Sequence, residues 1–272
     1  MSDFTERLIL DNKSKNNIIY NEHLVRYEFV KQFVKNKKVL DIACGSGYGS
    51  KILAKAGAGK VVAIDVDEEA IKFAKQNYGH KNIEYQVGNA EEIGQGSNIF
   101  DIISSFETIE HLQNPNKFLS ELSRVAKDNG LVIISTPNKD VFKQKNPFHL
   151  KEFSKTEFEE ILGKYFKFHK ILEQGNGMTS CILSGTETDI RCLSVATDRY
   201  RMSVSAPALP APLYFIAICS QEKDAVENLQ IQNMASINFT ALEKLYNNPV
   251  LKISDKIYSW LKKLINLIRP TA

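Results

Sequence analysis

The feature that most constrains the fold is the segment 39–50, Val-Leu-Asp-Ile-Ala-Cys-Gly-Ser-Gly-Tyr-Gly-Ser, where an apolar strand meets a glycine-rich turn. A helix is predicted to begin directly afterwards, near Tyr48. Gly45 and Gly47 let the backbone turn tightly and approach a bound molecule, which a Cβ atom would prevent. Free N–H groups at the start of the helix also favour a ligand at the turn. This unit therefore predicts an α/β protein that binds a small molecule at the carboxyl end of a strand.

Strands and helices alternate from residue 38 onward, which predicts a parallel sheet with helices on both faces. The predicted strands after the first are 61–65, 83–87, 100–106 and 131–136, and the predicted helices are 48–57, 67–78 and 114–127. Two later strands, 166–173 and 213–219, are expected to form an antiparallel pair. The fold class is therefore a Rossmann-like, doubly wound α/β fold whose seven-stranded sheet is mostly parallel with one antiparallel edge strand.

Composition divides the chain into three parts. Residues 1–37 predict an N-terminal helical cap, residues 38–221 the α/β domain with an insertion at about 175–211, and residues 222–272 a polar linker and an amphipathic helix. The insertion is expected to help build or cover a site for the second substrate, because long loops usually have a function. Within the domain, Ser154 and Glu157 have the spacing of a capping box, which predicts a helix over 154–162.

The polar residues at and after the predicted strands restrict the class of ligand that the site can bind. Ser50 stands where the dinucleotide-binding pattern requires glycine. Asp41 lies within the first strand, Asp65 ends the second, and Asn89 follows the third. Together these segments resemble the motifs of class I S-adenosylmethionine-dependent methyltransferases, of the kind known as methyltransferase types 11 and 23.

This resemblance implies S-adenosylmethionine as the cofactor. The carboxylate of Asp65 would accept hydrogen bonds from ribose hydroxyls, Val66 would cover one face of the adenine, and Arg26 would bind the methionine carboxylate. The complete set of cofactor-binding residues predicted is Arg26, Asp41, Gly45, Gly47, Asp65, Val66, Asn89, Ala90 and Phe106.

Two histidines lie in loops that would face the methyl acceptor, His111 after the fourth strand and His149 after the fifth. An oxygen acceptor must lose a proton, so either imidazole is a candidate general base, although His111 would equally serve to brace a neighbouring loop. The same histidines with Glu107 and Glu110 would suit Mg²⁺, Mn²⁺, Fe²⁺ or Zn²⁺. That set resembles the metal site of small-RNA 2′-O-methyltransferases. In other members of the class, similar glutamates contact the cofactor or cap a helix.

The N-terminal segments 5–9 and 21–27 resemble methyltransferases encoded with glycosyltransferases in bacterial surface-polysaccharide clusters. The predicted activity is therefore O-methylation of a sugar or glycan intermediate. Alternatives are an O-methyltransferase for RNA ribose or a quinone-like phenol, an inactive cofactor-binding scaffold subunit and, least favoured, a nicotinamide oxidoreductase. A net charge of +3 disfavours nucleic acid, because phosphate contacts need a basic stripe.

A cytoplasmic location is predicted, because the N-terminus is polar and no apolar run is long enough to cross a bilayer. The segment 251–269 predicts an amphipathic helix with Trp260 on its apolar face and lysines on the other. Such a helix would dock on its own domain or a partner subunit, or would lie peripherally on the inner membrane surface.

Overall fold

The computed structural model describes residues 18–142, 146–176, 179–183, 189–193, 201–205, 212–229 and 234–237. The strands are β1 (Lys38–Ile42), β2 (Lys60–Asp65), β3 (Ile83–Val87), β4 (Phe100–Ser105), β5 (Ala126–Pro137), β6 (Phe168–Asn176), β7 (Thr179–Leu183), β8 (Asp189–Leu193), β9 (Arg201–Ser205), β10 (Tyr214–Ser220) and β11 (Met234–Ile237). The helices are α1 (Ile18–Val30), α2 (Tyr48–Lys55), α3 (Glu68–Tyr78), α4 (Pro115–Val125), α5 (Lys155–Leu162) and α6 (Lys223–Glu227), with 3₁₀ turns η2 (Lys31–Phe33) and η3 (Ile109–His111).

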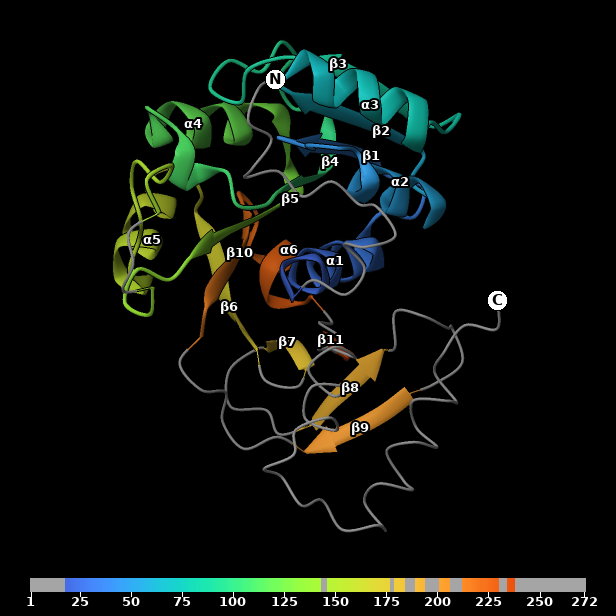
Figure 1. Cartoon of the computed structure of the whole chain (residues 1–272). Helices are drawn as coiled ribbons and strands as arrows, with labels where there is room; N and C mark the ends of the chain where they lie inside the picture. The colour runs from blue at the N-terminus through green and yellow to red at the C-terminus, as the bar shows by residue number, and fades with distance from the viewer. Residues whose placement is uncertain are drawn as a thin grey trace.

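The main sheet has nine strands among the described residues, in the order β11-β7-β6-β10-β5-β4-β1-β2-β3 (Figure 1). β1 pairs in parallel with β2 on one side and with β4 on the other. The strand order therefore reverses beside β1, and in open α/β sheets this switch point is where ligands bind. β10 runs antiparallel between β5 and β6. The predicted seven-stranded mixed sheet is confirmed as the part from β6 to β3, and β7 and β11 extend it beyond β6.

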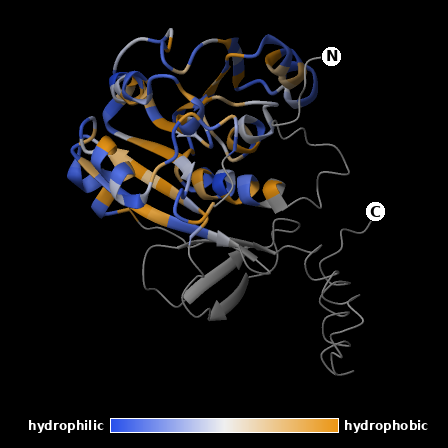
Figure 2. Ribbon diagram, turned by 60° about the vertical axis from the view of Figure 1, so that its left-hand side comes forward, coloured by the Kyte–Doolittle hydropathy of each residue, from blue (hydrophilic) through white to orange (hydrophobic). Residues whose placement is uncertain are grey.

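Helices cover both faces of the sheet, because successive strand residues point to opposite sides. In β1, Leu40 and Ile42 join the cluster that packs against α4 and α5. The intervening Val39 joins the cluster formed with α1 and α2. Figure 2 shows apolar strands enclosed between helices of mixed polarity. The result is a three-layer fold that holds the carboxyl ends of the parallel strands in fixed positions.

Side-chain caps fix where three helices begin. The Asp67 carboxylate accepts from the N–H groups of Glu69 and Ala70 at the start of α3, and Asn114 caps α4 ahead of Pro115. Ser154 and Glu157 form the predicted capping box of α5. These three helices therefore begin within a residue of their predicted positions.

The C-terminal third differs from expectation. The predicted polar linker after residue 221 contains α6, whose Val226 is buried, and strand β11. The predicted insertion contributes strands β7, β8 and β9, which sequence patterning did not reveal. The predicted helix at 251–269, and residues 1–17 of the predicted cap, lie outside the described residues. Within the part of the chain that the structure describes, no helix is long and apolar enough to cross a membrane.

Candidate functional site

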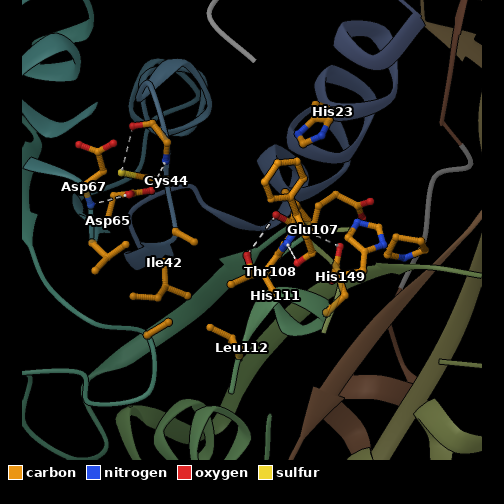
Figure 3. Close-up of a pocket in the computed structure, with 18 of the residues that line it drawn as sticks. His23, Ile42, Cys44, Asp65, Asp67, Glu107, Thr108, His111, Leu112 and His149 are labelled. Carbon is orange, nitrogen blue, oxygen red and sulfur yellow. Dashed lines mark hydrogen bonds and ion pairs between the residues drawn. The ribbon is translucent and has the colours of Figure 1, made fainter. Parts of the chain in front are cut away.

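One cavity of about 850 Å³ lies at the switch point, at the carboxyl ends of β1 to β4. Its walls come from the glycine turn after β1, the acids after β2, the segment 88–91 after β3 and the segment 106–113 after β4. Helix α1 and the loop at 146–152 complete it. Figure 3 shows Asp65 and Cys44 on one side of this space and His111 and His149 on the other. The cavity therefore has a β2–β3 side and a β4–β5 side.

The glycine turn is open where it faces the cavity and tightly packed behind. Gly45 has a φ of +54°, and a Cβ atom there would meet nothing within 4 Å. Its N–H donates to Asp65 Oδ2 at 2.8 Å. At Gly47, which is not among the residues lining the cavity, a Cβ would lie 2.6 Å from the Ala74 Cβ. Gly45 therefore leaves room for a ligand, whereas Gly47 is needed for packing against α3.

Asp41 is fully buried beneath this turn and does not line the cavity. Its carboxylate accepts hydrogen bonds from the hydroxyls of Ser50 at 2.6 Å, Ser104 at 2.9 Å and Tyr27 at 3.2 Å. Burial raises the pKa of Asp41 to about 6, although these three donors oppose the shift. Asp41 therefore stabilises the glycine turn from beneath it. The sequence had predicted that Asp41 contacts the ligand.

On the β2–β3 side the predicted residues converge. Both carboxylate oxygens of Asp65 accept backbone N–H groups, from Gly45 and from Asp67 at 3.0 Å, and the residue lines the cavity. Val66 lines the cavity with 67% of its side chain exposed. Asn89 and Ala90 also line the cavity. An apolar surface beside hydrogen-bonding groups suits a nucleoside.

Arg26 lies behind the wall of the cavity, fully buried, and does not itself line it. Its Nε donates to Gln174 Oε1 at 2.7 Å, and its guanidinium carbon lies 4.3 Å from the centre of the Tyr214 ring. Nη1 lies 3.3 Å from Glu107 Oε1, yet both terminal nitrogens lack a hydrogen-bond acceptor among the described residues. A buried cation with unsatisfied donors is costly, which favours an additional anionic or polar partner here.

Glu107 follows β4 with a φ of +50°, a left-handed conformation that is uncommon outside glycine. Its N–H donates to Ser135 Oγ at 3.1 Å, and the Ser135 hydroxyl donates back to Glu107 Oε1 at 2.6 Å. Phe106, directly before it, lines the cavity and packs edge-on against Tyr27 at 5.1 Å. Contacts to β5 thus hold the strained residue in place.

Glu110 and His111 form the turn η3. Thr136 Oγ1 donates to Glu110 Oε2 at 3.3 Å, while Oε1 is buried without a hydrogen-bond partner. Burial and the charge of Glu107 raise the pKa of Glu110 well above its ordinary value. His111 Nδ1 lies 3.0 Å from the carbonyl oxygen of Phe148. Because a carbonyl only accepts, Nδ1 carries the proton, and the lone pair of neutral His111 is on Nε2.

Both ring nitrogens of His149 lie within hydrogen-bond distance of a side chain. Its Nδ1 lies 2.8 Å from Glu152 Oε1, and its Nε2 lies 3.0 Å from Asn146 Nδ2. The rings of His149 and His111 meet edge-on, with centres 4.9 Å apart. Both nitrogens of His149 therefore have hydrogen-bond partners, whereas His111 Nε2 lies 4.0 Å from Glu110 Oε1, beyond hydrogen-bond distance. The predicted bracing role of His111 is also observed, since it holds the Phe148 loop.

Three of the four predicted metal ligands come together. Single ligand atoms of Glu110, His111 and His149 lie within 4.8 Å of one another. Glu107 is outside this cluster, since its carboxylate pairs with Arg26 and Ser135.

Among the cavity-lining residues that sequence reasoning missed are His23, Tyr27 and Tyr214. Burial, and then the charge of Arg26, lower the pKa of His23 to about 3, so this imidazole is neutral. Tyr214 comes from β10, far away in sequence, and its hydroxyl donates to Glu22 Oε2 at 2.9 Å. For His23 and Tyr27, the only local signal of a place in the cavity was their spacing of four residues, which puts both on one face of α1.

The family described as a methyltransferase domain matches residues 33–177, more than half of the chain. This match includes the glycine turn, Asp65, Asn89 and the turn η3. The chain belongs to this methyltransferase domain family. The names of two curated relatives include S-adenosylmethionine dependence.

Two curated relatives illustrate the similarity. A Mycolicibacterium smegmatis protein with the name "probable S-adenosylmethionine-dependent methyltransferase" is 30% identical over 154 residues, covering 55% of this chain and 59% of its own. The ubiquinone biosynthesis O-methyltransferase of Hydrogenovibrio crunogenus is 34% identical over 121 residues, covering 43% of this chain and 50% of its own. The chain thus spans little more than half the length of the curated relatives it matches.

Among solved structures, the YcgJ protein of Bacillus subtilis superposes with a TM-score of 0.54 at 18% identity, covering 74% of this chain and all of its own. This likeness supports the fold alone.

Proposed function

We propose that the protein transfers a methyl group from S-adenosylmethionine to a hydroxyl oxygen, and that the acceptor is a sugar or glycan intermediate. The observation that carries this proposal is the position of His111. Its Nε2 lone pair is free to accept a proton, within the cavity that also holds Gly45 and Asp65. The sugar assignment rests on the resemblance of segments 5–9 and 21–27; the second lies in α1, and the first lies outside the described residues.

The bound cofactor would supply an activated methyl group whose leaving group is a neutral thioether. Asp65 would bind the ribose hydroxyls and Val66 the adenine. Arg26, with its unsatisfied donors, would supply positive charge behind the cavity wall on the side of the methionine carboxylate. His111 Nε2 would accept the proton that the acceptor hydroxyl loses, and the Phe148 carbonyl would keep the imidazole in the required tautomer.

Transfer of labelled methyl groups into fractionated cell extract tests the proposal. Label is expected in the glycolipid and polysaccharide fraction, and His111→Ala should reduce it by a factor of about 10²–10⁴ while S-adenosylhomocysteine binding stays intact. Label in RNA, protein or small molecules would refute the acceptor class. No label in any fraction, with cofactor binding intact, would instead favour the scaffold subunit.

A quinone-like phenol is the second candidate acceptor, favoured by the similarity to a ubiquinone biosynthesis O-methyltransferase. Label in the small-molecule fraction that depends on an added catechol would support it over the glycan.

A divalent metal at Glu110, His111 and His149 is a further proposal. Glu110 Oε1, which is buried without a hydrogen-bond partner, supports it. Glu110 must lose a proton to bind a cation, and the Asn146 amide must move away from His149 Nε2. A chelator should then abolish turnover, and a divalent ion should restore it. Full activity after exhaustive chelation would exclude the metal.

The cytoplasmic location and a peripheral membrane contact through 251–269 stay predictions. Vesicle sedimentation of the full chain and of a chain truncated before residue 251 would test the contact.

A further inference from the structure

Exposed apolar side chains gather at the cavity rather than being spread over the surface. The described part of the chain has six large exposed apolar residues, namely Ile19, Val66, Val87, Phe142, Phe148 and Leu150. Four of them, Ile19, Val66, Phe142 and Phe148, line the same cavity. Single exposed apolar residues are ordinary, but a group around one opening marks a binding surface.

Three of these residues form what we call the apolar rim: Ile19 on α1 and Phe142 and Phe148 after β5. Their exposed fractions are 50%, 36% and 54%. Val66, after β2, belongs to the side of the cavity predicted for adenine. The Phe142 ring packs 5.7 Å from that of Tyr214, which fixes its position on the opposite side. The apolar rim is therefore left for the molecule that receives the methyl group.

The loop that carries Phe148 is tied directly to the proposed base. The Phe148 carbonyl accepts from His111 Nδ1 at 3.0 Å, and the Leu150 and Lys151 N–H groups donate to the Glu110 carbonyl at 2.8 and 3.1 Å. Phe148 N–H also donates to Asn146 Oδ1. An apolar group resting on Phe148 would thus be held at a fixed position relative to His111 Nε2.

The charged groups around the cavity disfavour an anionic occupant. Its lining includes six carboxyl side chains, from Asp65, Asp67, Glu91, Glu107, Glu110 and Glu152, and no lysine or arginine among the described residues. A phosphate-bearing acceptor would face these groups without a direct cationic contact there. A neutral molecule with an apolar part would instead cover the rim and remove it from water.

We propose that the acceptor is amphiphilic, with a hydroxyl-bearing part that points to His111 and an uncharged apolar chain or ring that lies on Ile19, Phe142 and Phe148. This inference rests on the proposed function, because it concerns the acceptor end of the same site. It adds that the apolar part contributes to recognition independently of the chemistry at the hydroxyl.

Binding of probes with graded apolar length tests the inference without requiring turnover. Methyl, butyl, hexyl and octyl glucosides, and a matching series of alkylcatechols, would be titrated below their micelle concentrations into the protein saturated with S-adenosylhomocysteine. In at least one series the dissociation constant should fall by about twofold per added methylene, roughly half of what complete burial would give. Phe148→Ala and Phe142→Ala should each flatten this dependence.

Leu150→Ala is the matched control, because Leu150 is 53% exposed in the same loop but does not line the cavity. In the Leu150→Ala variant, the dissociation constant should depend on the alkyl chain length of the probe as it does in the wild type. Affinity that is independent of chain length in both series, or an equal loss in the Leu150 variant, would overturn the amphiphilic acceptor. Methyl transfer to the bound probes is a separate readout, whose absence would count against the proposed function while leaving the binding result intact.

Discussion

The packing of Gly49 against α1 gives the sharpest test of how the glycine turn is built. A Cβ atom at Gly49 would lie 2.0 Å from Tyr27 Cζ and 2.2 Å from its Cε1. The ring has little room to withdraw, because Tyr48 and Phe106 pack on it with ring centres 5.5 and 5.1 Å away. Its hydroxyl is also bonded to Asp41 at 3.2 Å.

Gly49→Ala should therefore destabilise the protein by about 2–4 kcal/mol. Overpacking of a core costs about 1–3 kcal/mol, and displacement of the Tyr27 hydroxyl from buried Asp41 adds about 1 kcal/mol for the lost hydrogen bond. The free energy of unfolding is measured by urea titration followed by circular dichroism. A loss below about 0.5 kcal/mol, the scale of ordinary surface substitutions, would show that the ring moves freely.

Gly45→Ala is the matched control, since a Cβ there meets nothing within 4 Å and only the φ of +54° is unfavourable. Its stability should fall by about 1–2 kcal/mol. Because the new methyl group would occupy the ligand side of the turn, its affinity for S-adenosylhomocysteine should fall as well. If Gly45→Ala were less stable than Gly49→Ala, the assignment of Gly45 to the ligand side of the turn and of Gly49 to the packed side would be wrong.

Three further results are expected. Asp65→Ala should weaken S-adenosylhomocysteine binding about five- to 150-fold in calorimetry, on the order of 1–3 kcal/mol for the lost hydrogen bonds; unchanged affinity would contradict the role of this carboxylate. The pKa of Asp41 is raised to about 6, so the folded state holds this proton more tightly than the unfolded state, and the resulting stabilisation is present below about pH 4 and lost as the pH rises through about 6. Urea titrations should accordingly show that the free energy of unfolding of Asp41→Asn, relative to that of the wild type, rises by on the order of 2–3 kcal/mol from about pH 4 to pH 7. A difference between the two proteins that does not change with pH would refute the raised pKa. Ser154→Ala should lower stability by about 1 kcal/mol through loss of the capping box, whereas a thermal midpoint equal to that of wild type would mean that the cap contributes nothing.

The parts of the fold that the sequence predicted are those specified by local patterns. Alternating strands and helices, and caps such as Ser154, depend on residues within a few positions of each other. The strands of the predicted insertion were missed although their partners are close in sequence: β7 pairs with β6 and β8 pairs with β9. β11 was missed because its pairing partner lies far along the chain. For β11, even the partner strand β7 belongs to the insertion.

The candidate site divides in the same way. Asp65 and Val66 were placed correctly in the cavity, because the end of a parallel strand and the residue after it reach the ligand side of the sheet. Arg26 and Asp41 were predicted as ligand contacts but lie behind the wall, since burial depends on what packs in front of them. Tyr214 was missed because β10 brings it to the cavity from near the end of the α/β domain.

The cavity beside β1 is assigned to S-adenosylmethionine. Calorimetric titration of S-adenosylhomocysteine into the wild-type protein, with NAD as the comparison ligand, tests this assignment. One saturable site for S-adenosylhomocysteine, weakened by Asp65→Ala, and no binding of NAD are expected. Binding of NAD alone, or S-adenosylhomocysteine binding that is indifferent to Asp65, would contradict it.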